Sequence, residues 1–546
     1  MDYDIVPYDV IPALVHWAKV FFICLGMVLL VAMASSLAAL GWAGPAAVLR
    51  QIQLGLRDFA DSSWRRIWAI AMLTIREAIR RKALVVFVIF AVLFMFAGWF
   101  LNKSNEMAAA QVKEHVSFAL RTITWLMLPV MLLLSCWGIP EDIRLRSLHT
   151  VVTKPARRSE IVIGRILGFS CVGTLVLAVM SIVGYVWIIR QLSPEVREQQ
   201  LLCRVPVYGS LSFLNREGNP TNKGVNTGDV WSFRSYIEGA TKSAAIWRIS
   251  GLTAETLVPV DDPAAKGEKT PGLLFETRFE AFRSHKGVIG TGLLAQVQFV
   301  NEEKKLRVPI KAFPVSEYRG DLLEVPRKIL YYDNDAKTHK TVDLLDDLAP
   351  DGNLRIDVQC LNSGQYLGMA RPDLFIRTPD RSFAIGYFKA TAGIWLMMVL
   401  LAMLGVTMSC SVKGPVAILF SFSLLIVGHW LRELMEKLVS GKLSGGGPVE
   451  SIYRMVTRKN QVVPLDEVWW VPPMKGVDAV AKECLWLAQQ VIPNFDYYNM
   501  SAYVANGFDV SFSAALLPSI MVTAGFVLPC LIIGYYSLRL RELESK

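Results

Sequence analysis

Long uncharged stretches of hydrophobic residues recur along the chain, and segments rich in Lys and Arg separate them. A bilayer core about 30 Å thick needs roughly 20 apolar residues in a helix that rises 1.5 Å per residue. The chain has seven uncharged stretches of about that length or more: Val20–Trp42, Ala83–Leu101, Thr122–Pro140, Ile166–Ile189, Ala390–Val412, Gly414–Leu431 and Val510–Leu538. The pattern therefore predicts a mainly α-helical membrane protein with about seven transmembrane helices.

Residues 191–385 differ in composition from the hydrophobic stretches, because they are polar and rich in turn-forming residues. In Leu354–Cys360 the apolar side chains alternate with Arg355, Asp357 and Gln359, which is the period of a half-buried strand. Phe275–Phe282 and Ala295–Val300 read similarly. Several short strands between turns predict an inserted β-sandwich-like domain. Cys360 lies on the apolar face, which favours a core thiol, and a disulfide with Cys203 stays open as the alternative.

The basic residues that flank the stretches define the expected orientation. They gather in the connections after the first and the third stretch and at the C-terminal end. With seven alternating spans these segments share one side, and the positive-inside rule makes that side cytoplasmic. The acidic N-terminus argues against a signal peptide. We expect residues 191–385 and a shorter segment, 433–509, to be extracytoplasmic, the second with helices that dip into the membrane and a helix over Val477–Val491.

Composition adds little that the pattern does not already say. The formal charge of +10 suggests nucleic-acid binding at first sight, but the charges flank the spans and no groove-reading motif accompanies them, so we expect none. The eight Cys form no CxxC pair and the six His are dispersed, which predicts no metal site. The spans carry no Asp, Glu, Lys or Arg, which argues against an ion-coupled carrier.

Two basic segments are the candidates for function. Trp64–Lys82 is amphipathic, with Trp64, Trp68 and further apolar residues at a three-to-four spacing, and predicts a helix along the membrane interface. Residues 141–160 connect two antiparallel spans and are longer than such a connection needs. Their mixed charges suggest a short helix offered to a partner, and an orientation signal alone is the other reading.

The residues of the second segment resemble a known family. An acidic pair at Glu141, a basic stretch, and then Lys154-Pro155-Ala156-Arg157-Arg158-Ser159-Glu160-Ile161 with Gly164-Arg165 look like the corresponding segment of type-2 ABC (ABC-2) exporter permeases. The Trp64–Lys82 helix resembles their elbow helix. Ile492–Asp496 and Asn506-Gly507 are similar to a stretch in permeases grouped with multicopper-enzyme maturation. The resemblance covers about residues 64–190 and 386–546. The first stretch, the 191–385 insertion and Ser147-Leu148 depart from the family pattern.

The resemblance implies a fold and a set of roles. It implies a six-helix permease core in two halves, 64–190 and 386–546, with 1–63 as an extra N-terminal helix and linker. It implies a homodimer or heterodimer of permeases in a bacterial inner membrane, driven by a cytoplasmic ABC ATPase subunit. Segment 141–160 would be the coupling helix that contacts this ATPase through Glu141, Arg144, Arg146, Lys154, Pro155, Arg157, Arg158 and Glu160. The elbow helix would include Trp64, Arg65, Arg66, Trp68, Arg76 and Arg80.

The chain itself lacks the residues for ATP chemistry. It contains no G-x-x-x-x-G-K-[ST] phosphate loop, which cradles ATP in such systems. We therefore expect no enzyme and no cofactor in this chain, with ATP used only by the partner. The sequence thus predicts the membrane-spanning subunit of an exporter with an unassigned substrate. The alternative is a membrane-anchored extracytoplasmic binding or scaffold protein whose β-rich domain is the active part.

Overall fold

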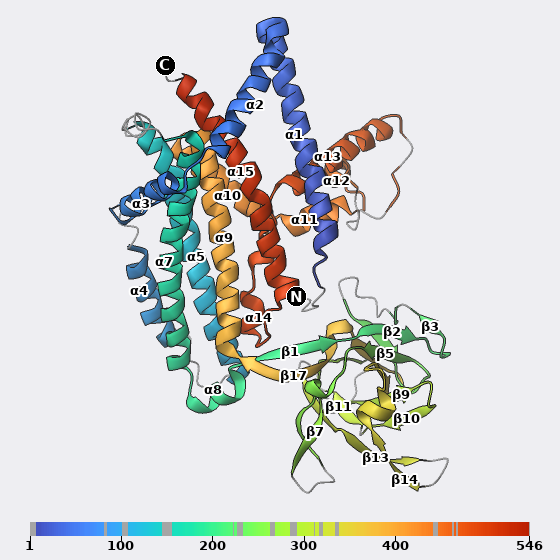
Figure 1. The fold of residues 1–546 in the computed structure, drawn as a ribbon. Coiled ribbons are helices and arrows are strands. Elements are labelled where there is room, and N and C mark those ends of the chain that lie inside the picture. Colours follow the sequence, from blue (N-terminus) through green and yellow to red (C-terminus); the bar gives the residue numbers. More distant parts are fainter. Residues whose placement is uncertain are drawn as a thin grey trace. The chain divides into compact units, whose positions relative to one another are not determined.

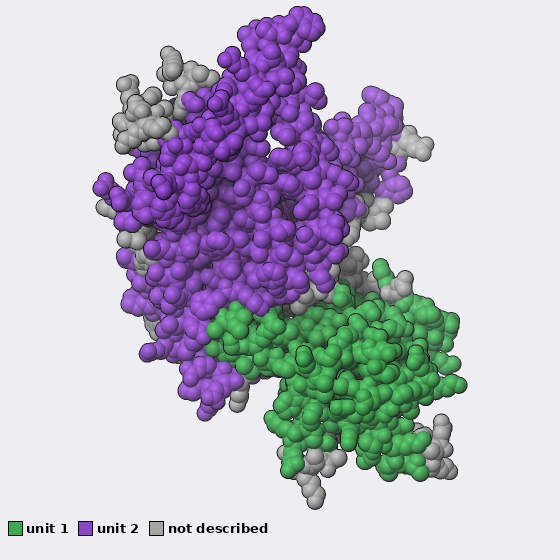
Figure 2. Space-filling model, viewed as in Figure 1, with its two compact units in different colours: residues 1–6, 201–386, 507–509 green, residues 7–200, 387–506, 510–546 purple. Residues whose placement is uncertain are grey.

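The chain folds into two compact units, a helical one and a β-rich one (Figure 2). The β-rich unit contains Leu201–Gly386 and Gly507–Asp509, and the helical unit contains Pro7–Gln200, Tyr387–Asn506 and Val510–Lys546. The computed structural model describes residues 7–80, 85–100, 108–144, 156–221, 223–225, 233–262, 268–283, 292–310, 312–315, 320–333, 338–440, 446–460, 463–465 and 468–544. Each unit is described by itself.

The helical unit is built from long apolar helices and several short ones (Figure 1). They are α1 (Val10–Leu40), α2 (Gly44–Ala60), α3 (Trp64–Arg80), α4 (Val85–Phe100), α5 (Ala108–Arg144), α7 (Arg158–Gln191), α8 (Pro194–Gln200), α9 (Phe383–Ser411), α10 (Gly414–His429), α11 (Arg432–Val439), α12 (Pro448–Thr457), α13 (Val471–Val491), α14 (Ser501–Ala505) and α15 (Leu517–Glu544). Each of the seven stretches expected from the sequence overlaps one of these helices, and α13 includes the expected helix over Val477–Val491.

Several of the described helices are long and apolar enough to cross a membrane. Five segments meet that description: Val10–Ala60, Ala110–Ile143, Arg158–Gln191, Phe383–Ser411 and Phe512–Arg541. A sixth arises if α10 and α11, which are bent by 56° at their junction, form one span. The remaining apolar helix, Val88–Ala97, is shorter. The prediction of a membrane protein with several spanning helices is confirmed, and the number seven stays a prediction.

Helix α9 forms the centre of this unit. Its most apolar window is 83% buried, against 50% for α5 and α7 and 0% for the α1–α2 segment. Such a helix reads as apolar on every side because protein covers every side. Tyr387 of α9 donates its hydroxyl to the Ser181 carbonyl of α7 at 3.0 Å, which satisfies a polar group that would otherwise be costly at this depth.

The β-rich unit contains two larger sheets and two smaller ones. Its strands are β1 (Leu202–Tyr208), β2 (Ser210–Leu214), β3 (Pro220–Thr221), β4 (Ser235–Glu238), β5 (Ala244–Ile249), β6 (Val258–Asp261), β7 (Lys269–Thr277), β8 (Glu280–Arg283), β9 (Leu293–Asn301), β10 (Leu306–Pro309), β11 (Phe313–Val315), β12 (Asp321–Pro326), β13 (Lys328–Asp333), β14 (Thr338–Asp343), β15 (Leu354–Cys360), β16 (Gln365–Met369) and β17 (Leu374–Ser382). One large sheet has the order β1-β17-β7-β12 with β6 beside β7. The other has the order β10-β9-β15-β5-β2-β3 with β11 beside β9.

The two larger sheets share one hydrophobic core. Phe275 of the first sheet and Phe299 of the second are both buried, with ring centroids 5.6 Å apart. Strand β15 alternates buried and half-buried residues as its sequence predicts, and β9 includes the expected strand over Ala295–Val300. The expected single strand over Phe275–Phe282 is wrong, because β7 ends at Thr277 and the chain resumes as β8 in a different sheet.

The cysteines of this unit are free thiols. Cys203 and Cys360 are both buried and neither forms a disulfide, so the interpretation of Cys360 as a core thiol is confirmed. Burial raises the pKa of the Cys360 thiol above its ordinary value, because a thiolate loses its hydration there. Both residues therefore pack as small apolar groups.

A short segment far along the chain completes the β-rich unit. Phe508 forms a parallel bridge with Arg204 of β1, and its ring is 3% exposed. Arg204 donates its backbone N–H to the Gly507 carbonyl at 2.8 Å and its guanidinium lies 4.4 Å from the Phe508 ring centre. Arg381 pairs with Asp509 at 2.8 Å. No pattern in the sequence predicts this strand-like addition, which directly precedes the segment leading into α15.

Candidate functional site

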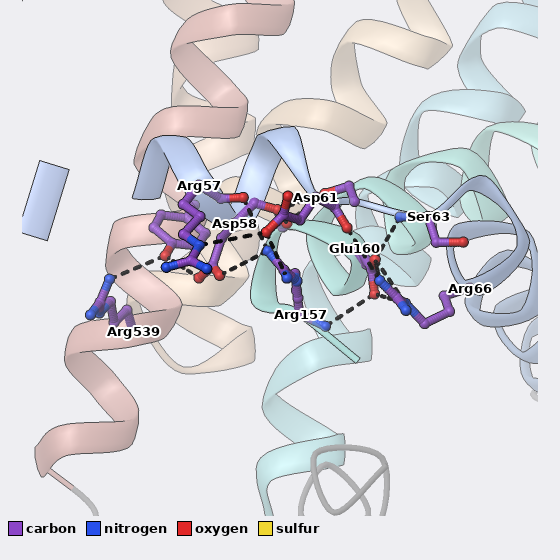
Figure 3. A network of polar contacts seen from close by, with 11 residues as sticks. Arg57, Asp58, Asp61, Ser63, Arg66, Arg157, Glu160 and Arg539 are labelled. Carbon is purple, nitrogen blue, oxygen red and sulfur yellow. Dashed lines mark hydrogen bonds and ion pairs between the residues drawn. The ribbon is translucent and has the colours of Figure 1, made fainter. Parts of the chain in front are cut away.

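A cluster of charged groups at the basic end of the helical unit is the strongest candidate site, and we call it the polar joint (Figure 3). Its members come from the end of α2, the residues before and within the first turn of α3, the start of α7 and the C-terminal part of α15. They are Arg57, Asp58, Asp61, Ser62, Ser63, Arg66, Arg157, Ser159, Glu160, Tyr535 and Arg539. The joint connects elements that are more than 470 residues apart in the chain.

Glu160 is the centre of the joint. Its side chain is fully buried, and its carboxylate accepts hydrogen bonds from the backbone N–H of Ser63 at 2.7 Å and of Arg157 at 3.0 Å. Ser63 precedes α3 and Arg157 precedes α7, so one carboxylate caps the N-termini of two helices. Negative charge is favoured there by the unpaired N–H groups and by the helix dipoles.

Arg66 supplies the charge partner of Glu160. Its guanidinium donates to both carboxylate oxygens at 2.7 to 2.9 Å, the planar two-point geometry that makes such pairs strong. The hydrogen bond to Glu160 raises the pKa of Arg66 above its ordinary value. A fully buried carboxylate is costly unless it is paired and hydrogen-bonded, and here both conditions are met.

Arg157 connects the same point to α2. Its guanidinium pairs with Asp61 at 2.9 Å and with Asp58 at 3.5 Å, and it donates to the Arg57 carbonyl at 3.0 Å. Ser159 donates its hydroxyl to the Asp58 carbonyl at 3.0 Å. The start of α7 is therefore held between the end of α2 and the start of α3.

The last helix joins the cluster through Tyr535. Its hydroxyl donates to the Asp58 carboxylate at 2.7 Å, and Arg539 donates to the Tyr535 oxygen at 3.1 Å. Asp58 thus bridges α2, α7 and α15. A displacement of any one of these helix ends has to break or carry along the contacts of the others.

A second buried ion cluster lies one turn and a half further along α7. Arg165, whose side chain is 6% exposed, contacts Glu77 of α3 at 2.6 Å and also pairs with Asp142 of α5. Two carboxylates around one guanidinium are retained only if the surrounding helices hold them in place. Together the two clusters connect α3, α5 and α7 at the same end of the unit.

Close packing between α3 and α7 brings these charges within reach. Gly164 and Gly168 are four residues apart on α7, and both face α3. A Cβ at Gly168 would lie 2.5 Å from Thr74 Cβ and 2.8 Å from the Ala71 carbonyl oxygen, so only glycine permits this approach. The G-x-x-x-G spacing is typical of closely packed membrane helices.

The structure places the predicted elbow residues on α3 with two distinct faces. Ile67, Ile70 and Ala71 are buried against the helical unit. Trp64, Trp68, Arg65, Arg76 and Arg80 are exposed, as expected for a helix that meets a membrane surface. Of the predicted set, Arg66 alone takes part in the polar joint.

The predicted coupling segment is described only in part. Arg146, Lys154 and Pro155 lie outside the described residues, as does most of the expected short helix. Glu141 and Arg144 belong to the last turn of α5, and nothing is described of the Arg144 side chain. Arg157 and Glu160 hold helix ends together inside the chain, so their contacts described here are internal.

Several members of the two clusters were not predicted from the sequence. Asp58, Asp61 and Glu77 lie in segments that read only as interfacial or basic. Asp142 belongs to the acidic pair at Glu141, but no local spacing connects it to Arg165 or to the other three. The G-x-x-x-G pattern of Gly164 and Gly168 is visible in the sequence and is a signal for close helix packing. In the described part of the chain, no group of three or more His, Cys, Asp or Glu side chains is arranged to hold a metal ion.

Comparison with known proteins gives no identity: no protein-family model matches the chain, and searches of curated proteins and of solved structures found no match.

Proposed function

We propose that the chain is the membrane-spanning permease subunit of an ABC-2 type exporter and that a separate ATPase subunit supplies the energy. The observation that carries the proposal is the polar joint, in which Glu160 and Arg157 connect the starts of α3 and α7 to the end of α2. The joint includes Arg157 and Glu160, at the end of the 141–160 segment to which the sequence resemblance assigns the ATPase contact. A permease that is driven by a separate ATPase subunit needs a stiff connection between the surface that the ATPase contacts and the membrane helices.

The geometry supports a mechanical role for the joint. A push on the 141–160 segment reaches α7 through Arg157 and passes to α3 through Glu160 and Arg66, because these contacts are short and charged and the Glu160 carboxylate between them is buried. Transport by alternating access requires elements that shift as bodies between two arrangements. Helices α3 and α7 would shift together, since their closest approach leaves no room for sliding at Gly168.

The proposal also assigns the basic end of the helical unit to the cytoplasmic side of the membrane. The joint carries Arg57, Arg66, Arg157 and Arg539, and the positive-inside rule assigns such an end to the cytoplasm. On this assignment the protein lies in a bacterial inner membrane and residues 191–385 are extracytoplasmic. The partner would then meet the basic end, where an ATPase has access to ATP.

The test is co-purification. The chain is extracted in mild detergent from membranes of the cells that make it, and bound proteins are identified by mass spectrometry. The proposal expects a protein with a phosphate loop that stays bound through gel filtration. Pure chain without such a protein would contradict it.

A second function is supported by one observation, the independent core of the β-rich unit. Its buried residues, such as Trp247 and Phe299, form one cluster whose named members all belong to this unit. This favours a membrane-anchored binding or scaffold protein. Five or more spanning helices exceed what an anchor needs, so we rank this function second.

A further inference from the structure

Helix α3 carries two exposed rows of side chains that the polar joint does not use. The first row is apolar and contains Trp64, Trp68 and Ile79, which are 65%, 46% and 53% exposed. Its steps of four and eleven residues are close to one and three turns of an α-helix, so these side chains lie along one line. Ile67 and Ala71 belong to the buried face of the same helix, so packing inside the chain does not use this apolar row.

The second row is basic and lies beside the first. It contains Arg65, Arg76 and Arg80, with steps of eleven and four residues, and all three are exposed. Arg65 and Arg80 directly follow Trp64 and Ile79 in the chain, which places them about 100° further around the helix. The two rows are therefore neighbouring strips of one helix surface, one apolar and one positively charged.

The described part of the chain does not neutralise the basic row. Its three guanidinium groups form no ion pair with a described residue. Glu77 is the only acidic residue within α3, and it pairs with Arg165 of α7 at 2.6 Å. A row of uncompensated positive charge attracts anions from outside the chain.

The contact with α7 places these rows at the edge of the spanning segments. Helix α3 packs on α7 at Gly164 and Gly168. Arg165 lies between the two glycines and is the last charged residue before the uncharged stretch Ile166–Ile189. A few residues after α3 the next uncharged stretch, Ala83–Leu101, begins. Both neighbours therefore place α3 where charged residues give way to the hydrocarbon core, which is the level of the lipid headgroups.

A lipid at this level fits both rows. Indole rings are enriched at the boundary between headgroups and acyl chains, and long basic side chains reach from there to the phosphates. The planar guanidinium donates two parallel hydrogen bonds to a phosphate. Each basic group near an anionic surface adds to the attraction, whereas a zwitterionic headgroup brings a positive charge of its own. Three such groups in one row therefore favour an anionic lipid.

We propose that the basic row of α3 binds the phosphodiester headgroups of anionic lipids, with the apolar row inserted among the adjoining acyl chains. Arg76 and Arg80 are about one turn apart and bind one phosphate, and Arg65, about 17 Å away along the helix, binds a second. The interfacial position expected of this helix leaves the class of lipid open, and the charge of the row determines it. The proposal concerns the chain alone and does not rest on the proposed function.

The test identifies the lipid beside position 68 in vesicles of equal amounts of anionic phosphatidylglycerol and zwitterionic phosphatidylcholine. The full-length chain carries the photo-crosslinking amino acid p-benzoylphenylalanine in place of Trp68, and mass spectrometry counts the adducts of each lipid. The matched control position is Leu175, which is 60% exposed on α7 and lies further into the uncharged stretch. We expect phosphatidylglycerol adducts to exceed phosphatidylcholine adducts about five-fold or more at position 68, and about equal numbers at position 175.

A triple variant tests the basic row itself, with the substitutions Arg65→Gln, Arg76→Gln and Arg80→Gln. It should lower the ratio of the two adducts at position 68 to the ratio at position 175. Inorganic phosphate added in excess over lipid should leave the ratio of the unsubstituted row unchanged, because the site holds a headgroup together with its acyl chains. A ratio that falls in inorganic phosphate would assign the row to a free anion and overturn the proposal.

A second triple variant controls for net charge. Lys269→Gln, Arg307→Gln and Lys328→Gln remove the same charge from exposed positions of the β-rich unit and should leave the ratio at position 68 unchanged. Gel filtration checks that both triple variants remain folded, and the comparison of positions 68 and 175 decides without them. Equal crosslinking to the two lipids at position 68, adducts to protein only, or a preference that survives loss of the basic row would each overturn the proposal.

Discussion

At the scale of single residues, the buried carboxylate of Glu160 determines how the basic end of the unit is held. It receives donors from Ser63 and Arg66 at the start of α3, about 95 residues earlier in the chain, and from Arg157 at the start of its own helix, α7. Removing one partner of such a group leaves a charge that is buried and uncompensated. The expected loss is large for one polar substitution.

The first prediction concerns Arg66. Arg66→Met should lower the stability of the detergent-solubilised protein, because it leaves the buried Glu160 carboxylate without its charge partner. Arg65→Met, on the exposed neighbour, should change it by less than about 0.5 kcal/mol. Adding Glu160→Gln to Arg66→Met should recover part of the loss, because the unpaired charge is then gone.

Thermal unfolding followed by gel filtration measures these differences. Equal losses for Arg66→Met and Arg65→Met would show that the pair does not hold the two helices together.

The second residue-scale prediction concerns acid stability of the β-rich unit. Burial opposes ionisation of Asp343, but hydrogen bonds from the Asp346 and Leu345 N–H groups and from Arg327 outweigh it, so its pKa lies below the ordinary value. A carboxyl with a depressed pKa contributes stability above its unfolded pKa, and this is lost as the pH falls through the folded pKa. The β-rich unit should therefore open more readily below about pH 4.

Hydrogen exchange in β15, corrected for the intrinsic pH dependence, measures this opening. Asp343→Asn keeps an oxygen acceptor for the two N–H groups, and it should reduce the rise in exchange rate at low pH. Asp351→Asn, at an exposed turn, should leave it unchanged. If hydrogen exchange in Asp343→Asn still rises as the pH falls, groups other than Asp343 cause the acid opening.

At the scale of elements, the pairing of α3 with α7 is the contact on which the joint depends. Gly168→Ala places a Cβ against the Ala71 carbonyl oxygen and Thr74, and backbone cannot give way as a flexible side chain does. We expect a loss of about 1–3 kcal/mol, the range for overpacking. Gly26→Ala, where nothing lies within 4 Å, should be neutral or slightly stabilising. The same thermal assay compares them, and a neutral Gly168→Ala would mean that the helices separate easily.

Elements differ in how well the sequence predicts them, for physical reasons. Periodicity identified the spanning helices, α3 and strand β15, because burial on one face or on all faces leaves a direct record in residue type. It did not identify the break between β7 and β8, since Arg278 and Phe279 interrupt pairing without a Gly or Pro. It also missed α2 as a helix of its own.

The polar joint was predicted only in part for a related reason. Arg66, Arg157 and Glu160 stood in motifs, but their partners Asp58 and Asp61 are ordinary acidic residues whose role depends on tertiary proximity. Charge pairs between distant segments leave no spacing in the sequence. The addition of Phe508 to the β-rich unit is of the same kind, because one strand-like residue has no periodicity.

At the scale of the whole molecule, the account assigns different tasks to its parts. The long helices form the membrane-spanning body, the joint connects their basic ends, and the β-rich unit is a separately folded module of unassigned role. The proposed transport function depends on the claim that a separate ATPase acts on the basic end of the helical unit.

That claim is tested most directly by ATP hydrolysis of the purified complex in lipid vesicles, compared with the ATPase subunit alone. The account predicts vanadate-sensitive hydrolysis whose rate changes when the chain is present, and a smaller change when the chain carries Arg66→Met. Hydrolysis that is the same with and without the chain would contradict the account, because the joint would then transmit nothing between the subunits.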